Sequence, residues 1–103
     1  MRIAVVSTDG TNVDDHFGKA TRFLVFDLDG ERQTLVANRP VSPLSSGAPG
    51  HAFDPGRFAS LAEALEDCQQ VYCTRIGKKP ATELEARGVD TVVYHGPIDQ
   101  ITP

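Results

Sequence analysis

The feature that most constrains the fold of this chain is the Asp-Gly pair at residues 29 and 30. The run before it, residues 22–28 (RFLVFDL), is rich in β-branched and aromatic residues, and residues 31–38 (ERQTLVAN) follow it directly. An Asp-Gly pair between two such runs is a strong signal for a tight hairpin. The sequence therefore predicts two antiparallel strands joined by a short turn.

The segments around this hairpin extend it into a larger sheet. Residues 2–7 (RIAVVS) form a continuous apolar run, which is typical of a strand buried on both faces. After the hairpin, two short strand-like segments alternate with helical ones: a helix at 54–68, a strand at 69–74, a helix at 77–88, a strand at 89–95 and a last helical turn at 96–101. A hairpin followed by two strand–helix units predicts a five-stranded mixed sheet with helices on its faces. The second strand is expected to run antiparallel to the rest.

Both expected helices have recognisable ends. Asp54 is placed to cap the first helix and Pro55 to occupy its first position. Pro80 lies in the first turn of the second helix, and Gly88 is expected to end that helix in the left-handed conformation. Between hairpin and first helix, residues 39–54 are rich in proline and glycine. A long segment of this kind is predicted to be a loop without strands or helices.

Length and charge limit the classes of function. With 103 residues the chain is predicted to form one domain over residues 1–103. It carries 10 basic and 14 acidic residues, and the basic ones form no stripe of the kind that phosphate backbones require. A nucleic-acid partner is therefore not expected. No apolar run approaches the ~18 residues of a membrane span, and the first apolar run is short for a signal peptide, so a cytoplasmic protein without a membrane partner is expected.

Cys68 and Cys73 are predicted to act separately. If residues 69–74 form a strand, five steps of about 3.3 Å each place the two residues far apart. A disulfide requires Cα atoms within about 7 Å. The two cysteines are therefore expected to form neither a disulfide nor a shared metal site.

The predicted topology brings most metal-binding residue types to one sheet edge. Four loops leave the carboxyl ends of the strands that run in one direction, and ligands of open α/β sheets bind at that edge. These loops carry all three histidines and one of the two cysteines. Nitrogen and sulfur donors together indicate a transition metal or an iron–sulfur species. The candidate metal ligands are therefore His16, His51, His95 and Cys73.

Each candidate also has a purely structural interpretation. Cys73 follows two core-type residues and could be a small core residue, because free cysteine is often buried. His51 could be an ordinary loop residue, His95 a strand end, and His16 a turn residue. Asp14 and Asp15 are better explained as turn or cap residues. Arg75 precedes Gly77 and the second helix, whose N-terminus would attract an anion, although a plain strand-to-helix turn explains the segment equally well.

Two stretches of the chain resemble a known family. Residues 1–30 contain Asp9-Gly10 followed by His16-Phe17-Gly18 and an aromatic-rich strand. Residues 73–96 contain Ile76-Gly77, then Leu84, then Gly88-Val89. Together these motifs are similar to the nitrogenase iron–molybdenum cofactor biosynthesis accessory domains. This NifX-like group also forms the C-terminal part of the radical enzyme of cofactor assembly.

The resemblance implies a three-layer α/β/α ribonuclease H-like fold and a non-catalytic binding role. Such domains carry or store iron–sulfur or iron–molybdenum cofactor precursors during assembly for nitrogen fixation, and their partners are assembly or acceptor proteins. Within the family motif, His16, Phe17 and Gly18 are the implied cofactor-binding residues, joined by Gly77. Arg75, the remaining cofactor-binding candidate, comes from the anion-attracting turn described above. No nucleotide is expected, because Ser7-Thr8-Asp9-Gly10 lacks the glycine spacing of a phosphate-binding loop.

The number of thiols argues for transient binding. A permanent iron–sulfur cluster is usually held by three or four thiolates, whereas this chain offers one at the expected edge. Two alternatives stay open. The domain could be a regulatory interaction module without a cluster, or an Mg²⁺-dependent phosphotransferase or nuclease that uses Asp9. Such an enzyme needs clustered carboxylates, and the acidic net charge disfavours a nucleic-acid substrate.

Overall fold

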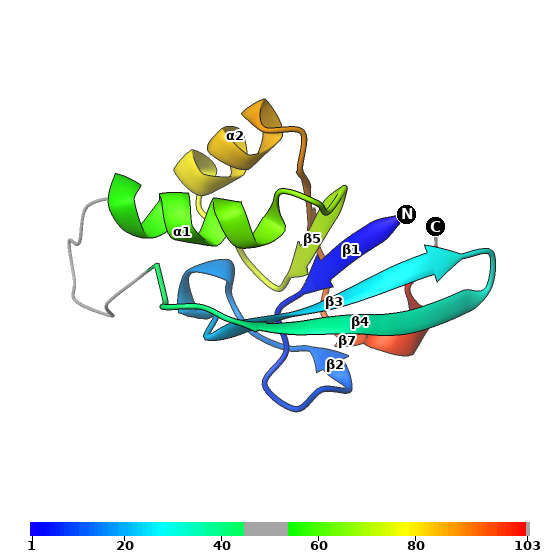
Figure 1. Cartoon of the computed structure of the whole chain (residues 1–103). Coiled ribbons are helices and arrows are strands. Elements are labelled where there is room, and N and C mark those ends of the chain that lie inside the picture. Colours follow the sequence, from blue (N-terminus) through cyan, green and yellow to red (C-terminus); the bar gives the residue numbers. More distant parts are fainter. Residues whose placement is uncertain (45–53, 103) are drawn as a thin grey trace.

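A five-stranded mixed sheet forms the centre of the computed structural model, which describes residues 1–44 and 54–102 (Figure 1). Its strand order is β4-β3-β1-β5-β6, and a second sheet pairs β2 with β7. The strands are β1 (Arg2–Val5), β2 (Asn12–Val13), β3 (Arg22–Asp29), β4 (Arg32–Pro40), β5 (Gln70–Cys73), β6 (Asp90–Val93) and β7 (Gly96–Pro97). The helices are α1 (Pro55–Leu65) and α2 (Lys78–Ala86), with 3-10 turns η1 (Phe17–Lys19) and η2 (Ile98–Gln100).

The strand directions confirm the mixed sheet that the sequence predicts. β3 runs antiparallel to both of its neighbours, β1 and β4, while β1, β5 and β6 are parallel. β3 is therefore the one strand of this sheet that opposes the rest. β1 lies in the middle of the sheet, and three of its four residues are buried.

The hairpin turn lies one residue later than the Asp-Gly pair suggests. Asp29 pairs with Arg32, so the two turn residues are Gly30 and Glu31. Gly30 has φ +62°, and no residue other than glycine has a positive φ among those described. Positive φ at the first turn position alone is the pattern of a type II′ turn, which favours glycine there. Asp29 thus ends the strand instead of entering the turn.

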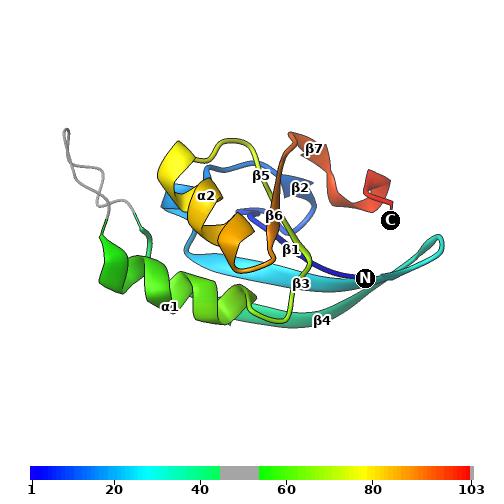
Figure 2. The ribbon, with the colours of Figure 1, turned by 90° about the horizontal axis from the view of Figure 1, so that it is seen from above.

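Alternate residues of β1 belong to two separate cores. Ala4 packs in a cluster with α1 and α2, whereas Ile3 and Val5 pack in a cluster with β2 and η2. Both α-helices accordingly cover the same face of the sheet, and the small sheet and η2 cover the other (Figures 1 and 2). This corrects the expected three-layer α/β/α arrangement, because no α-helix covers the second face in the described part of the chain.

The helix ends follow the predicted signals. The Asp54 side chain accepts hydrogen bonds from the backbone N–H groups of Gly56 and Arg57, and Pro55 opens α1. α2 closes with Gly88 at φ +84°, and the N–H of Val89 donates to the Leu84 carbonyl. This is a Schellman motif, and its two apolar members, Leu84 and Val89, are both buried in the helix-side core.

The largest differences from the sequence prediction concern short elements. β2 lies inside a stretch that reads as a turn, and β7 starts a stretch expected to be helical throughout. Strands of two residues have no hydrophobic period, so pattern analysis misses them. The expected strands at 2–7, 69–74 and 89–95 are also shorter, and only η2 remains of the last helical turn.

Candidate functional site

A pocket of about 170 Å³ lies where the loops after β1 and β5 meet. The loop after β1 contributes His16, Gly18 and Lys19, and the loop between β5 and α2 contributes Arg75, Ile76 and Gly77. Both loops leave carboxyl ends of parallel strands, which is where ligands of open α/β sheets bind. The pocket therefore lies at the edge of the sheet that the sequence predicts.

Backbone hydrogen bonds join the two loops. The N–H of Phe17 donates to the Arg75 carbonyl, and the N–H of Thr74 donates to the Asp15 carbonyl, both at 2.9 Å. The first loop is also bound to η2, because the N–H of Ile98 donates to the Thr11 carbonyl at 2.9 Å. The pocket walls are thus fixed by the backbone before any ligand binds.

Phe17 holds the pocket in place from beneath. Its side chain is completely buried in the helix-side core, with its ring centroid 5.8 Å from that of Phe23. His16 and Gly18 flank it and face the pocket. Of the five predicted cofactor-binding residues, His16, Gly18, Arg75 and Gly77 line this pocket, whereas Phe17 is a core residue beside it.

Two lining residues, Lys19 and Ile76, were missed by the sequence analysis. Lys19 closes the single turn of η1, in which its N–H donates to the His16 carbonyl at 3.1 Å. Its position three residues after His16 could have indicated that Lys19 lies at the same site. Ile76 is partly buried and packs against the helix-side core, so it supplies an apolar wall.

In the part of the chain that the structure describes, the pocket is lined by cationic side chains and by no acidic one. Lys19 and Arg75 are exposed, and α2 begins at the pocket with Gly77 at its N-cap and no capping side chain. A helix N-terminus presents unpaired N–H groups and a partial positive charge. The nearest acidic residues are engaged in the loop itself: Asp14 accepts from Thr8, and Asp15 accepts from the N–H of His16. The site thus favours an anion.

Three of the four predicted metal ligands, His16, Cys73 and His95, lie among the residues that the structure describes. No group of three or more His, Cys, Asp or Glu side chains is close enough there to hold a metal ion. His51 lies outside the described residues. His95 is exposed beyond the end of β6, and His16 alone of the set lines the pocket.

Cys73 is a buried core residue. Its side chain is fully enclosed in the helix-side core, and burial raises the pKa of its thiol to about 11. The backbone N–H groups of Arg75 and Phe17 face the sulfur and oppose part of this pKa shift. A protonated, enclosed thiol is a poor metal ligand. Cys68 is also buried and free, as expected for two cysteines that form no disulfide.

The carboxylate of Asp9 organises its own loop. It accepts hydrogen bonds from the N–H groups of Thr11 and Asn12, from the Asn12 amide and from the Ser7 hydroxyl. These donors, led by Asn12, hold the pKa of Asp9 well below its usual range. Its oxygens are therefore already engaged, which leaves little capacity for the metal-binding role of a phosphotransferase.

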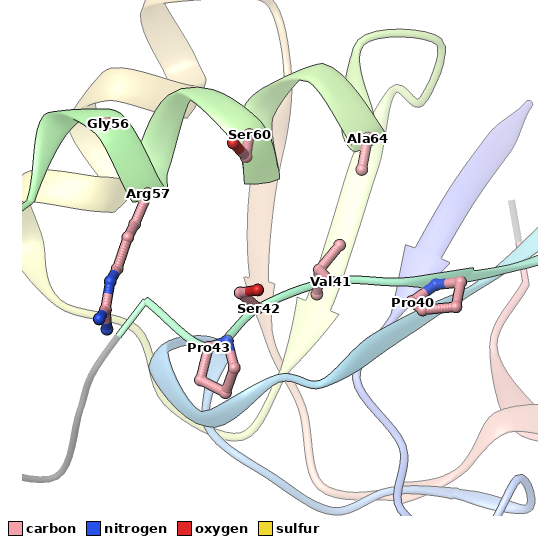
Figure 3. Close-up of a pocket in the computed structure, with 8 residues that line it drawn as sticks. All are labelled: Pro40, Val41, Ser42, Pro43, Gly56, Arg57, Ser60 and Ala64. Atoms are coloured by element: carbon pink, nitrogen blue, oxygen red, sulfur yellow. The ribbon is translucent and has the colours of Figure 1, made fainter.

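A larger hollow of about 840 Å³ lies between α1 and the segment after β4 (Figure 3). Pro40, Val41 and Pro43 form one wall, and α1 forms the other. Among the described residues, Arg57 is the only charged side chain that lines the hollow, and it is paired with Asp54 at 3.7 Å. His16, Lys19 and Arg75 line the smaller pocket and not this hollow.

Fold and pocket together define a small mixed α/β domain with a cation-lined pocket. In the residues that the structure describes, no helix is long and apolar enough to cross a membrane. The family described as "Dinitrogenase iron-molybdenum cofactor" matches residues 1–102. The chain therefore belongs to this family, as its two motifs indicated.

Individual relatives agree with this assignment. The chain is 36% identical to the FeMo cofactor biosynthesis protein NifB of Chlorobaculum tepidum over 95% of its own length and 22% of that protein. It is 35% identical to protein NifX of Klebsiella pneumoniae over 86% of its length and 53% of that protein. Protein NifY of Azotobacter vinelandii is 33% identical over 89% of the chain and 35% of the relative. The chain thus corresponds to part of each of these longer proteins.

Solved structures support the fold. The crystal structure of PH0822 matches 98% of this chain and 84% of its own with a TM-score of 0.69 and 23% identity. The NMR structure of TM1290 from Thermotoga matches 96% of this chain and 80% of its own with a TM-score of 0.61 and 22% identity. The mixed α/β architecture described above is therefore found in experimentally solved proteins.

Proposed function

We propose that this chain is a non-catalytic carrier that transiently binds an iron–sulfur or iron–molybdenum cofactor precursor in the pocket between His16 and Gly77. The observation that carries the proposal is that four of the five residues expected to bind the cofactor line one cationic pocket. Membership of the iron–molybdenum cofactor family supplies the class of cargo. As part of this proposal, the fold is a variant of the ribonuclease H-like fold in which β2, β7 and η2 replace the second helical layer.

The charge of the pocket suits such a cargo. Clusters assembled from iron and sulfide are anionic, and their sulfide surface is also polarisable and weakly hydrated. Lys19, Arg75 and the start of α2 offer positive charge, while Ile76 offers an apolar wall. Of the described residues that line the pocket, His16 alone has a side chain that is a common ligand of transition metals.

The scarcity of ligands supports a temporary stay. A resident cluster usually has three or four thiolate ligands, and Cys73 is enclosed in the core. A cargo held by one imidazole and by electrostatic attraction can leave without breaking several metal–ligand bonds. This is the behaviour needed in a carrier that passes a precursor between assembly and acceptor proteins.

An enzymatic role is disfavoured by the state of the acidic residues. The oxygens of Asp9 and Asp14 are engaged within the first loop. Asp27 is paired with Arg2 at 2.8 Å. Two-metal catalysis needs carboxylates that converge on one site, and these three serve the loop and the sheet instead.

Anaerobic titration with an isolated iron–sulfur cofactor precursor tests the proposal. His16→Ala should weaken binding about tenfold, because one metal ligand is lost from a site that has few. His95→Ala is the matched control, since it removes an exposed histidine that does not line the pocket. We expect the control to bind like the unmodified chain.

The outcomes separate function from site. If the unmodified chain binds no precursor, the carrier function is wrong and an interaction module without a cluster becomes the better account. If it binds, and His16→Ala binds equally well, the function stands and the pocket is wrong. A loss in His95→Ala that matches the loss in His16→Ala would place the cargo away from the pocket.

A further inference from the structure

Four exposed basic residues lie in the pocket lining or directly after it in the sequence, and we call them the basic rim: Lys19, Arg75, Lys78 and Lys79. Lys19 and Arg75 line the pocket, and the two further lysines follow Gly77 at the start of α2. Among the described residues, no ion pair engages Lys19, Arg75 or Lys78. The rim is therefore a concentration of exposed positive charge.

This concentration contrasts with the rest of the chain. The whole chain has 10 basic and 14 acidic residues, so the rim holds four of its ten basic side chains. The rim comes from two short segments of the sequence, one at residue 19 and one at residues 75–79. Because charges of one sign attract the opposite sign over about a Debye length, such a surface selects a negatively charged partner.

The size of the pocket indicates that its cargo is not enclosed. Pockets that bury a small molecule usually have volumes of about 300–1,000 Å³. The pocket beside His16 measures about 170 Å³. Under the proposed function, a bound precursor would therefore project beyond the pocket mouth. A protein that supplies its remaining ligands must approach across the basic rim.

We propose that the basic rim is the docking surface for an acidic face of the protein that gives or receives the cargo. Carboxylates on that face would pair with Lys78, which lies outside the pocket lining, while the pocket residues keep the cargo. The cargo part of this inference rests on the proposed function. The charge complementarity does not, because it follows from the rim itself. Electrostatic docking of this kind mainly raises the association rate and fails at high salt.

The test uses the apo protein, so that its outcome is independent of cargo binding. A peptide of consecutive glutamates serves as the acidic probe, and amide shifts of the isotope-labelled chain report where it binds. We expect shifts at residues 16–19 and 75–79 that vanish when salt is raised from about 0.05 M to about 0.5 M, where charge screening is strong.

Lys78→Glu should weaken this binding about fivefold, because an exposed attraction becomes a repulsion. The substitution suits the first turn of α2, where acidic residues stabilise a helix, so the fold is expected to persist. Arg32→Glu is the matched control, since it makes the same charge change at an exposed position beside the hairpin turn. We expect the control to bind the peptide like the unmodified chain.

Three results would overturn the proposal. The peptide could shift amides elsewhere or nowhere, or Arg32→Glu could weaken binding as much as Lys78→Glu. A DNA strand of equal charge could bind the rim more tightly than the peptide, which would make it a nucleic-acid surface. If the docking test fails while the precursor still binds in the titration above, the carrier function stands without this surface.

Discussion

The two ends of the central sheet use the same charged residue types in opposite ways. At the amino ends of the parallel strands, Arg2 pairs with Asp27 at 2.8 Å and with Asp67 at 2.9 Å. Arg39 also pairs with Asp67, at 2.6 Å, and donates to the Ala64 carbonyl. At the carboxyl ends, the cations that line the pocket are not paired in this way. Lys19 and Arg75 have no carboxylate partner among the described residues.

This difference separates charges that stabilise the fold from charges that are available to a ligand. The paired charges connect β1, β3 and β4 to the segment after α1, so they contribute to the stability of the sheet. The cations around the pocket contribute little of that kind, and their positive charge stays available for a ligand. Substitutions at the amino end should therefore change stability, and substitutions of pocket cations should change binding.

The largest effect is expected from Phe17, a core residue that lies between the pocket-lining residues His16 and Gly18. Phe17→Ala removes a fully buried ring from the core and should lower the free energy of unfolding by about 3–5 kcal/mol. It should also weaken precursor binding, because the loop that carries His16 loses its anchor. Urea unfolding followed by circular dichroism measures the first effect. The control Leu35→Ala, on an exposed side chain of β4, should change stability by less than about 0.5 kcal/mol.

An intermediate effect is expected at the opposite end of the sheet. Asp67→Asn should lower stability by about 1 kcal/mol at neutral pH, since Asp67 is partly exposed and exposed pairs are weak. Precursor binding should stay unchanged. Asp90→Asn, at an exposed position of β6 where the Asp90 N–H donates to the Gln69 carbonyl, is the control and should leave both unchanged. Equal losses in the two variants would mean that the ion pairs do not stabilise the sheet.

The pH dependence follows from the same pair. Arg39, then Arg2, hold the pKa of Asp67 well below its usual range in the folded chain. The carboxylate therefore stabilises the fold above its unfolded pKa of about 3.9, and this contribution is lost as the pH falls below that value. The unmodified chain should lose more stability than Asp67→Asn between neutral and acidic pH. Parallel stability curves for the two proteins would contradict this prediction.

The smallest change in stability, with a larger change in binding, is expected at Gly77. Its φ of −69° and ψ of 156° suit any N-cap residue, and an added Cβ would lie 3.4 Å from Pro80 Cδ, so neither conformation nor packing requires glycine. Gly77→Ser should cap α2 and stabilise the fold by about 0.3 kcal/mol. The same hydroxyl would cover the N–H groups that face the pocket and should weaken precursor binding about threefold. Unchanged affinity in a stabilised variant would exclude the start of α2 from the site.

Much of the fold could be predicted because local signals agree with the tertiary structure. The hairpin, the caps at Asp54 and Gly88 and the apolar run at β1 each have a local cause. The replacement of the second helical layer by β2, β7 and η2 could not be predicted in this way. The pairing of β2 with β7 joins residues 12–13 to residues 96–97, and no local pattern encodes a contact at that separation.

The sequence predicted the sheet edge at which the pocket lies, but not which of the candidate metal ligands line it, for reasons of geometry. Assigning a residue to the carboxyl edge of a sheet fixes its position along the strand direction, but not its position across the strands. The loop that carries His16 lies against the segment after β5, because the Thr74 N–H donates to the Asp15 carbonyl. His95 follows β6, the next strand of the sheet, and does not line the pocket. Cys73 was placed at the correct edge, but it shares the helix-side core with Val71, two residues earlier in the same strand. Side-chain alternation along β5 was the signal that it points into the core.

The central claim is that the cargo binds between His16 and Gly77, and paramagnetic line broadening tests it most directly. An iron–sulfur precursor added anaerobically to the isotope-labelled chain broadens the amide signals nearest to it. The account predicts that residues 16–19 and 75–77 lose intensity first, while residues 56–64 beside the larger hollow and the region around His95 keep theirs. Broadening that begins at the larger hollow or at His95, with residues 16–19 unaffected, would contradict the account.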